Sequence, residues 1–379
     1  MKRLYLLIPA IGILTLSVFM NPLSAAPSGA DTTGVHSLTQ AIKLAVNNNP
    51  AVQAAKRNWE AAQEEIPVSG AWANPTLSYT QFAAPVETRN GPQQQQIGLQ
   101  QMIPLWGTTG LKRQATVHRA QKAHQNYLAA RQETIAQVKS VWAALYKTDQ
   151  SMREIRKYRR LIVTVQEIAR TRYATGKGNQ AEVLKSQLEL SQLDERLLRF
   201  SELRQQKAHS LNRILNRPIS GAIGTIDTLI LPEHNKSKAE LMQLLANHRQ
   251  DLLELRELMA VKESMVSIAQ RRNLPSVGLG VNYIRIGETA LPGAPEPGSD
   301  ALALMVRVDL PLWFGANKSR VQSAKSGVSE TRFRYADRRN TAESEVRTLD
   351  FQLRQSRETL ALYRESLLPQ AKQAFDAAL

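Results

Sequence analysis

The sequence predicts a mainly helical protein with a smaller membrane β part, arranged as a tandem structural repeat. Three observations lead to this fold class: long stretches without helix breakers, four segments in which apolar residues alternate with period two, and the same order of elements in both halves of the chain. Assembled from several copies, these elements predict long α-helical hairpins forming a trimeric α-barrel, joined to a transmembrane β-barrel with four strands per protomer.

Internal repetition is visible from the first helix of each half. Helix-capping sequences, S-x-x-Q and S-x-x-E, begin 200 residues apart, and further matches follow at offsets of 200 and then 207. The seven extra residues of the second half therefore lie between its two strands, where a loop tolerates insertions. The matched pairs are Ser37 with Ser237, Pro75 with Pro275, and residues 103–106 with residues 310–313.

The longest stretch without glycine or proline covers 65 residues, 111–175. A continuous helix of that length would reach roughly 97 Å, at about 1.5 Å per residue, which exceeds any globular domain. A glycine-containing turn follows at residues 176–178, and residues 179–217 are again free of breakers, with apolar residues at heptad spacing. The sequence therefore predicts a long antiparallel helical hairpin over residues 111–217, although a simple coiled-coil rod would show the same pattern.

Each half also contains a pair of strands, at about residues 76–103 and 276–310. Residues 301–310 alternate apolar with polar or small side chains over ten positions, which is the length of a membrane strand. Arg307 and Asp309 share the polar face and are candidates for lining a lumen; a plain contact between strands is the alternative. Each strand taken singly also suits a soluble antiparallel sheet, but four in one exported chain favour a membrane sheet.

Four strands cannot close into a barrel, because single-chain bacterial barrels begin at about eight. Three chains supply twelve strands, remove every exposed edge and bring the long helices together into a second, helical tube. In this arrangement residues 37–219 form the first repeat and residues 236–379 the second. Residues 220–235, with two glycines and a short apolar stretch, connect them on the outside of the helical region.

Residues 1–26 have the features of a signal peptide. Lys2 and Arg3 precede an apolar stretch at residues 4–20, and small side chains at residues 24–26 offer a cleavage site. A retained membrane anchor is the alternative, but a stretch of this length, interrupted by proline and glycine, lies at the lower edge of spanning length. The net charge of +16 is dispersed along the chain. Export together with this dispersion argues against a nucleic-acid partner.

The sequence shows no constellation for catalysis, metal binding or cofactor binding. The chain lacks cysteine, which excludes disulfides, thiolate metal sites and lipidation on an N-terminal cysteine. His118 and His124 fall on different faces of a helix, and the adjacent Glu64 and Glu65 point to different sides, so paired acid–base chemistry is not expected. We expect a protein that is not an enzyme and that has no cofactor and no metal.

The chain resembles the TolC-type outer-membrane efflux protein family from about residue 37 to its end. The order and duplication of the motifs carry the resemblance, rather than any one of them. These motifs are Leu38-Thr-Gln-Ala41, Asn48-Asn49-Pro50, Ala73-Asn-Pro-Thr-Leu77, Tyr173-Ala-Thr-Gly176, Arg249-Gln-Asp251-Leu252, Leu274-Pro275 and Leu310-Pro-Leu-Trp313.

This resemblance implies a homotrimer in the cell outer membrane, surrounded there by lipid, whose helical barrel projects through the periplasm. Its partners would be a periplasmic adaptor, or membrane fusion, protein and an inner-membrane efflux pump of the RND type. The Pro-Leu-Trp segments and the glutamines at residues 93–96 are similar to the branch that serves heavy-metal RND pumps. The sequence departs from the family at its end: adding 207 to position 173 places the second hairpin turn near position 380, so the second repeat is expected to stop before that turn.

The function that the resemblance implies is passive export through a water-filled duct, which opens when the adaptor engages the hairpin tip. The substrate would be heavy-metal ions or organic toxicants. A periplasmic adaptor or structural coiled-coil protein without a membrane barrel is the alternative, although duplication over the whole length speaks against it. The candidate partner-binding residues at the tip are Tyr173, Thr175, Gly176, Lys177, Gly178 and Asn179.

Overall fold

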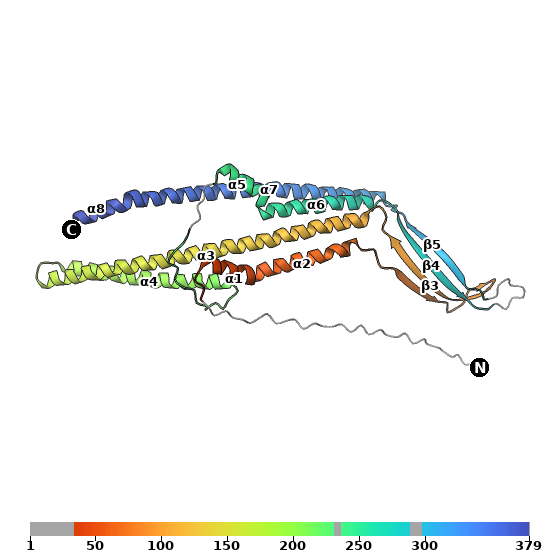
Figure 1. Cartoon of the computed structure of the whole chain (residues 1–379), viewed down its shortest axis with the longest axis horizontal. Coiled ribbons are helices and arrows are strands. Elements are labelled where there is room, and N and C mark those ends of the chain that lie inside the picture. Colours follow the sequence, from red (N-terminus) through yellow and green to blue (C-terminus); the bar gives the residue numbers. More distant parts are fainter. Residues whose placement is uncertain (1–33, 231–235, 289–297, 379) are drawn as a thin grey trace, which may run out of the picture.

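The protein is elongated, with a small sheet at one end and the turn of a long helical hairpin at the other (Figure 1). Its structure, a computed structural model, describes residues 34–230, 236–288 and 298–378. The expected signal peptide at residues 1–26 and part of the expected connector lie outside these described residues.

Two similar sets of elements follow each other along the chain. The first set comprises α1 (Leu38–Asn48), α2 (Pro50–Gly70), β1 (Thr76–Gln81), β2 (Glu87–Thr88), β3 (Gly91–Ile103), α3 (Thr108–Ala174) and α4 (Gln180–Ile214). The second comprises α5 (Lys238–His248), α6 (Gln250–Arg271), β4 (Ser276–Ile286), β5 (Ala301–Asp309), α7 (Phe314–Leu362), a π-helical turn η1 (Tyr363–Leu367) and α8 (Leu368–Ala378).

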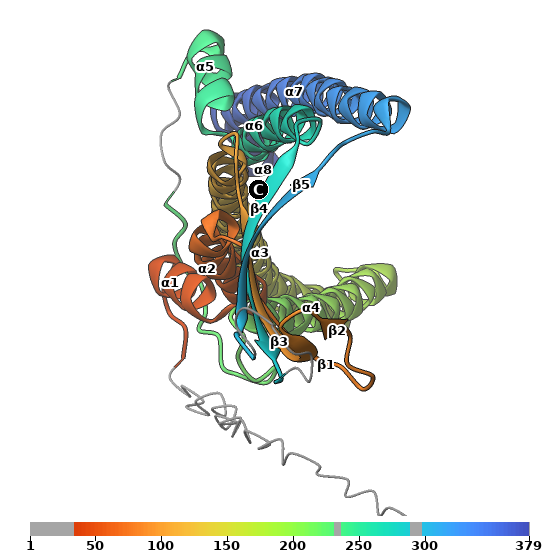
Figure 2. The same ribbon diagram turned by 90° about the vertical axis from the view of Figure 1, so that its right-hand side faces the viewer.

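The helical layer and the sheet share one order. Helices α2, α3, α6 and α7 pack each against the next, and along the chain they adjoin strands β1, β3, β4 and β5 respectively. The sheet has the strand order β1-β3-β4-β5, with β2 paired to β3. Viewed along the molecule, the layer is open and curved (Figure 2). Its two margins are therefore α2 with β1 and α7 with β5.

All strand pairs of the sheet are antiparallel, and their register sorts the side chains onto two different faces. Leu99 of β3 lies opposite Leu77 of β1 and Val281 of β4, which in turn lies opposite Leu304 of β5. This row belongs to an apolar face that is exposed to solvent in the single chain. Its exposed members are Leu77, Tyr79, Ile97, Leu99, Leu279, Val281, Tyr283, Leu302, Leu304, Val306 and Val308.

Side-chain caps explain where the short helices begin. Asn49 Oδ1 accepts a hydrogen bond from the Ala51 N–H (2.9 Å), and Pro50 occupies the first position of α2. Ser237 forms a full capping box with Glu240 at the start of α5. Ser37 caps α1 in the same way, but the reciprocal bond differs, because the side chain of Gln40 accepts from the His36 N–H instead.

The main hydrophobic core lies where α1, α3, α4 and the start of the connector meet. Trp142 and Leu145 of α3 pack there with Leu211 of α4, and Val35 forms a parallel β-bridge with Ile223 of the connector. The second repeat has a smaller cluster of Leu245, Leu252 and Ala342. The two repeats are therefore alike in topology but unequal in the amount of buried core.

The predicted fold class is confirmed by the long hairpin of α3 and α4, the four main strands and the duplicated order of elements. Two details were not predicted: the two-residue strand β2 and the π-helical turn η1. Among the described residues, none of the helices combines the length and the apolar character needed to cross a membrane.

Candidate functional site

The turn between α3 and α4 is a Schellman motif. Gly176 has φ 68°, in the left-handed region that favours glycine. The N–H of Lys177 donates to the carbonyl of Arg172 (2.8 Å), and the N–H of Gly176 donates to that of Tyr173 (3.1 Å). These bonds satisfy two carbonyls at the end of α3, so the chain reverses without leaving them unpaired.

The other half of the turn prepares the start of α4. Asn179 caps α4, because its Oδ1 accepts from the Ala181 N–H (3.0 Å). Gly178 has no room for a side chain, since a Cβ there would lie 2.9 Å from the Cβ of Arg172. The structure thus brings the six predicted tip residues together at one end of the molecule, where Tyr173 and Lys177 are exposed. Binding of a partner at this tip stays a prediction.

The second group of predicted site residues lies at the helical end of the sheet. Arg307 Nε donates to Asp309 Oδ1 over 3.1 Å, so the pair contacts within one strand, and Ser276 Oγ of β4 lies 3.3 Å from Asp309 Oδ2. Both side chains are exposed. They share the face opposite the apolar one, as the alternation predicts. A role in lining a lumen stays a prediction.

The polar face also carries two methionines, of which the alternation in residues 301–310 places only Met305 there. Met102 lies in the row of Gly278 and Arg307, and Met305 lies opposite Gly280. A Cβ at Gly278 would lie 2.7 Å from the Met102 sulfur, and one at Gly280 would lie 3.0 Å from the Met305 methyl group. The glycines of β4 therefore make room for both thioethers on this face.

A buried ion pair fixes the connector to the hairpin. Asp149 of α3 accepts from Arg204 Nε of α4 (2.5 Å) and from the backbone N–H of Ile226 (2.9 Å). Arg204 also donates to the carbonyls of Ile223 and Gly224. Sequence reasoning missed Asp149, although its spacing from Leu145 and Met152 places it on the buried side of α3.

A charged network joins α6 to α7 in the second repeat. Arg249 and Arg338 both contact Asp251 and Glu345, at distances from 2.5 to 3.2 Å. Hydrogen bonds from Arg249, and then from Arg338, hold the pKa of the Glu345 carboxyl below its usual value. Asn49, which corresponds to Arg249 in the first repeat, makes a different and uncharged contact, because its Nδ2 donates to the carbonyl of Ile214 at the end of α4 (2.9 Å).

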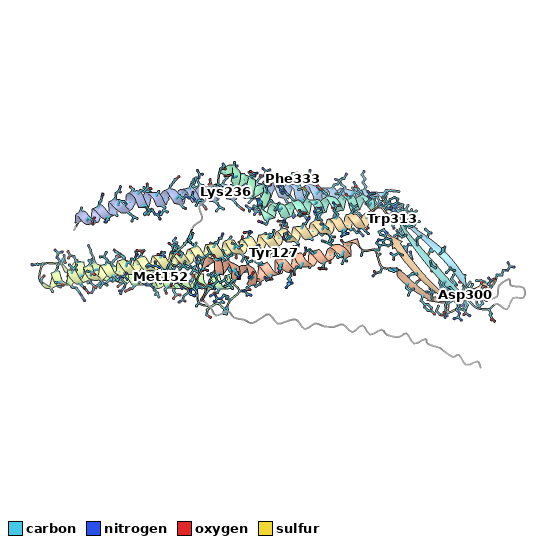
Figure 3. The ribbon with its side chains drawn as sticks, viewed as in Figure 1. Tyr127, Met152, Lys236, Asp300, Trp313 and Phe333 are labelled. Atoms are coloured by element: carbon cyan, nitrogen blue, oxygen red, sulfur yellow. The ribbon has the colours of Figure 1, made fainter. Side chains whose placement is uncertain are left out.

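The junction between sheet and helices joins the two repeats. Trp106, with φ 62°, donates its indole N–H to the carbonyl of Pro275 (2.8 Å). The equivalent residue of the second repeat, Trp313, is 80% exposed. It lies at the margin where β5 runs into α7 (Figure 3). The tryptophan of the first repeat therefore bonds to the second repeat within the chain, whereas the tryptophan of the second repeat is exposed at the margin.

His118 and His124, for which no shared site was expected, each have a local partner. His118 Nδ1 lies 2.8 Å from Glu257 Oε2, and the ring of His124 lies 4.3 Å from that of Trp59. Within the described residues, no three His, Asp or Glu side chains converge in a way that suits a metal ion.

Comparison with protein families decides the assignment. The model of a family described as outer membrane efflux protein matches residues 41–217 and 241–379, which cover both repeats. The chain belongs to the outer membrane efflux protein family. This membership confirms the resemblance to TolC-type proteins. Members of this family are passive, non-enzymatic channels of the outer membrane with a periplasmic helical part, and they form trimers that work with adaptors and inner-membrane pumps.

Solved structures show the same fold at low sequence identity. The outer membrane protein VceC of Vibrio cholerae is 18% identical, with a TM-score of 0.69 over 90% of this chain and 86% of that one. The CmeC outer membrane channel of Campylobacter jejuni is also 18% identical, with a TM-score of 0.66 over 90% and 76%. CusC is 13% identical, with a TM-score of 0.68 over 90% and 83%. No curated protein matches the sequence significantly.

Proposed function

We propose that the chain is one subunit of a homotrimeric efflux duct that crosses the outer membrane through its sheet and the periplasm through its helices. The observation that carries the proposal is the two-faced sheet. Exposed apolar side chains cover one face of all four main strands. The residues of the other face include glutamine, serine, asparagine and glycine. Outer-membrane lipid would cover the apolar face, and water would fill the polar side.

Exposed apolar residues along the helices support assembly from several copies. A single chain leaves large apolar side chains exposed on both arms of the hairpin and on α7. Three copies would cover them and would join twelve strands into a closed barrel. The exposed residues include Tyr158, Leu161, Val165, Ile168, Leu184, Leu188, Leu198, Phe333, Leu349 and Phe351.

We divide the chain of the proposed subunit into four parts. Residues 1–26 direct export and are removed, residues 37–219 and 236–379 form the two repeats, and residues 220–235 connect them. The clamp of Asp149 and Arg204 supports this role for the connector, because it holds residues 223–226 against the outside of the hairpin.

The hairpin tip is the proposed contact for a periplasmic adaptor that is bound to an inner-membrane pump of the RND type. Tyr173 and Lys177 offer an exposed ring and an exposed charge on a rigid turn, while Gly176, Gly178, Thr175 and Asn179 set its shape. Engagement of the tip would open the duct.

Heavy-metal ions are the first candidate substrate, and organic toxicants are the second. The presence of Met102 and Met305 on the polar face favours metal ions as the substrate, because thioether sulfur is a soft ligand that suits ions such as Ag⁺ and Cu⁺. Arg307 and Asp309 add a charged pair to the same polar wall.

The test uses cells that lack their own efflux channel and express this protein with its adaptor and pump. The double variant Tyr173→Ala, Lys177→Ala should keep trimers but raise intracellular silver, because the turn survives and the partner contact does not. The control, Glu195→Ala with Arg199→Ala, removes an exposed pair on α4 and should keep wild-type export. Full export by the tip variant would refute the role of the tip, and export of an organic dye without silver would select the second substrate class.

A further inference from the structure

We propose that a hollow between α3, α4 and the connector binds a small oxyanion with two negative charges, of the phosphate class. The hollow has a volume of about 220 Å³ and lies within a single chain, so the inference goes beyond the proposed duct. The buried Met152, labelled in Figure 3, marks its place on α3. Its polar lining consists of Asp149, Arg153, Arg156, Arg160, Arg204 and Thr225.

Three separate segments of the chain contribute hydrogen-bond donors to this hollow. Arg153, Arg156 and Arg160 follow Asp149 on α3 at intervals of three or four residues, the spacing that aligns side chains along one side of a helix. Arg204 comes from α4 and Thr225 from the connector. Donors from two helices and a connecting segment therefore surround one small space.

Carboxylates match two of the four arginines. Asp149 accepts from Arg204 Nε (2.5 Å), and Asp227 of the connector pairs with Arg153. Arg156 and Arg160 are exposed, and neither forms an ion pair with any residue that the structure describes. The hollow therefore carries two guanidinium charges that no carboxylate of the described chain balances.

The excess charge and the size of the hollow define the ligand. A guanidinium group presents its N–H donors in a planar fork that matches the oxygens of a phosphate, and it stays charged at physiological pH. An ion with two negative charges balances Arg156 and Arg160 and relieves the repulsion between like charges on neighbouring turns of α3. The hollow is smaller than the roughly 300–1,000 Å³ of pockets for larger organic ligands, which favours a small ion.

The position of the hollow along the molecule indicates the source of the anion, and this step rests on the proposed function. Helix α3 runs from the sheet to the hairpin turn (Figure 1). Arg156 lies about 48 residues along α3 from its first residue, which corresponds to roughly 72 Å. If the sheet lies in the outer membrane, the phosphate groups of its lipids are out of reach. The ligand is then a free anion of the surrounding solution.

A bound anion would strengthen the attachment of the connector to the hairpin. Asp149 and Arg204 already hold residues 223–226 through hydrogen bonds to their backbone. An anion shared by Arg156, Arg160 and Thr225 adds a second attachment beside the first. Because a ligand of the native state stabilises that state, phosphate should slow the cutting of the connector in limited proteolysis.

Isothermal titration calorimetry with inorganic phosphate tests the proposal on the full-length protein, purified in detergent and a chloride buffer. We expect saturable binding with one site per chain, for which sulfate competes and chloride at equal ionic strength does not. Arg156→Gln with Arg160→Gln should weaken the affinity by about tenfold or more, because both unpaired guanidinium groups are lost. Each single variant should lose part of the affinity, which keeps the test decisive if the double variant folds poorly.

The matched control is Arg196→Gln with Arg199→Gln, which removes the same charge from the exposed surface of α4 outside the hollow. Its affinity for phosphate should stay within about twofold of wild type, because solvent and salt screen exposed charges. Equal weakening by both double variants would overturn the site in favour of general charge attraction. Wild-type protein without saturable phosphate binding would overturn it as well.

An unheated gel of the same samples reports the assembly separately. Phosphate binding by a protein that runs as a monomer would support the site while refuting the proposed duct. Trimers that bind no phosphate would overturn the site and leave the duct intact.

Discussion

At the scale of single residues, Asp149 shows how one buried carboxylate joins three parts of the chain. It lies on the buried side of α3, four residues after Leu145 and three before Met152, which is labelled in Figure 3. This spacing marks the residue in the sequence. Its partner Arg204 lies 55 positions away on α4, and no local pattern identifies that distant contact.

Asp149→Asn should destabilise the protein by about 2–4 kcal/mol, because a half-buried guanidinium loses its carboxylate. Thermal unfolding measures the change, and limited proteolysis should find the connector cut more rapidly. The matched control is Asp194→Asn, which removes an exposed Arg159–Asp194 pair between the same two helices and should cost about 0–1 kcal/mol. Equal effects of both variants would show that the clamp has no special role.

Glu345 gives a pH-dependent prediction. Because its folded-state pKa lies below the ordinary value of 4.5, its contribution to stability is present above about pH 4.5 and is lost as pH falls through the lowered pKa. Glu345→Gln should therefore lower the melting temperature slightly at pH 7 and flatten its fall in acid. The control is Glu343→Gln on the same helix, whose partner Arg339 lies within α7. An acid profile identical to wild type would contradict the assignment.

At the scale of elements, the hairpin turn depends on two glycines for different reasons. Gly176 needs its left-handed φ, and Gly178 needs the space that a Cβ would fill. Replacing both by valine should cost about 1–2 kcal/mol for the strained backbone alone and should reshape the tip. We expect efflux to be abolished while trimers persist, measured by drug or metal resistance and by native gel. Unchanged resistance would remove the turn from the mechanism.

Elements defined by long patterns were predictable, whereas those defined by tertiary contacts were not. The absence of glycine and proline over 65 residues predicts α3, and period-two alternation predicts β5 on the correct face. By contrast, β2 has two residues and exists only because it pairs with β3, and Val35 meets Ile223 across most of the first repeat. Such short pieces carry too few residues for a periodic signal.

The candidate site was likewise predictable only where a local sequence pattern marks its residues. The glycines at 176 and 178 mark the turn, and alternation places Arg307 and Asp309 on the polar face. The same alternation places Met305 on that face, whereas Met102 was missed, and only the register between strands shows that Gly278 and Gly280 of β4 lie beside the two methionines.

At the scale of the whole molecule, the single chain is an open layer with two unlike margins. Strand β1 with helix α2 forms one margin, and strand β5 with helix α7 forms the other. In the proposed trimer, lipid would cover the apolar sheet face, and copies joined margin to margin around an axis would cover the open strand edges, because closed symmetry leaves no edge free.

The most direct test of the account is fractionation of cells that express the protein, followed by comparison of unheated and heated gels. We predict that the protein lies in the outer-membrane fraction and migrates as a trimer until it is heated, when it becomes a monomer. A monomer found in the soluble periplasmic fraction would contradict the central claim that this chain assembles into an outer-membrane duct.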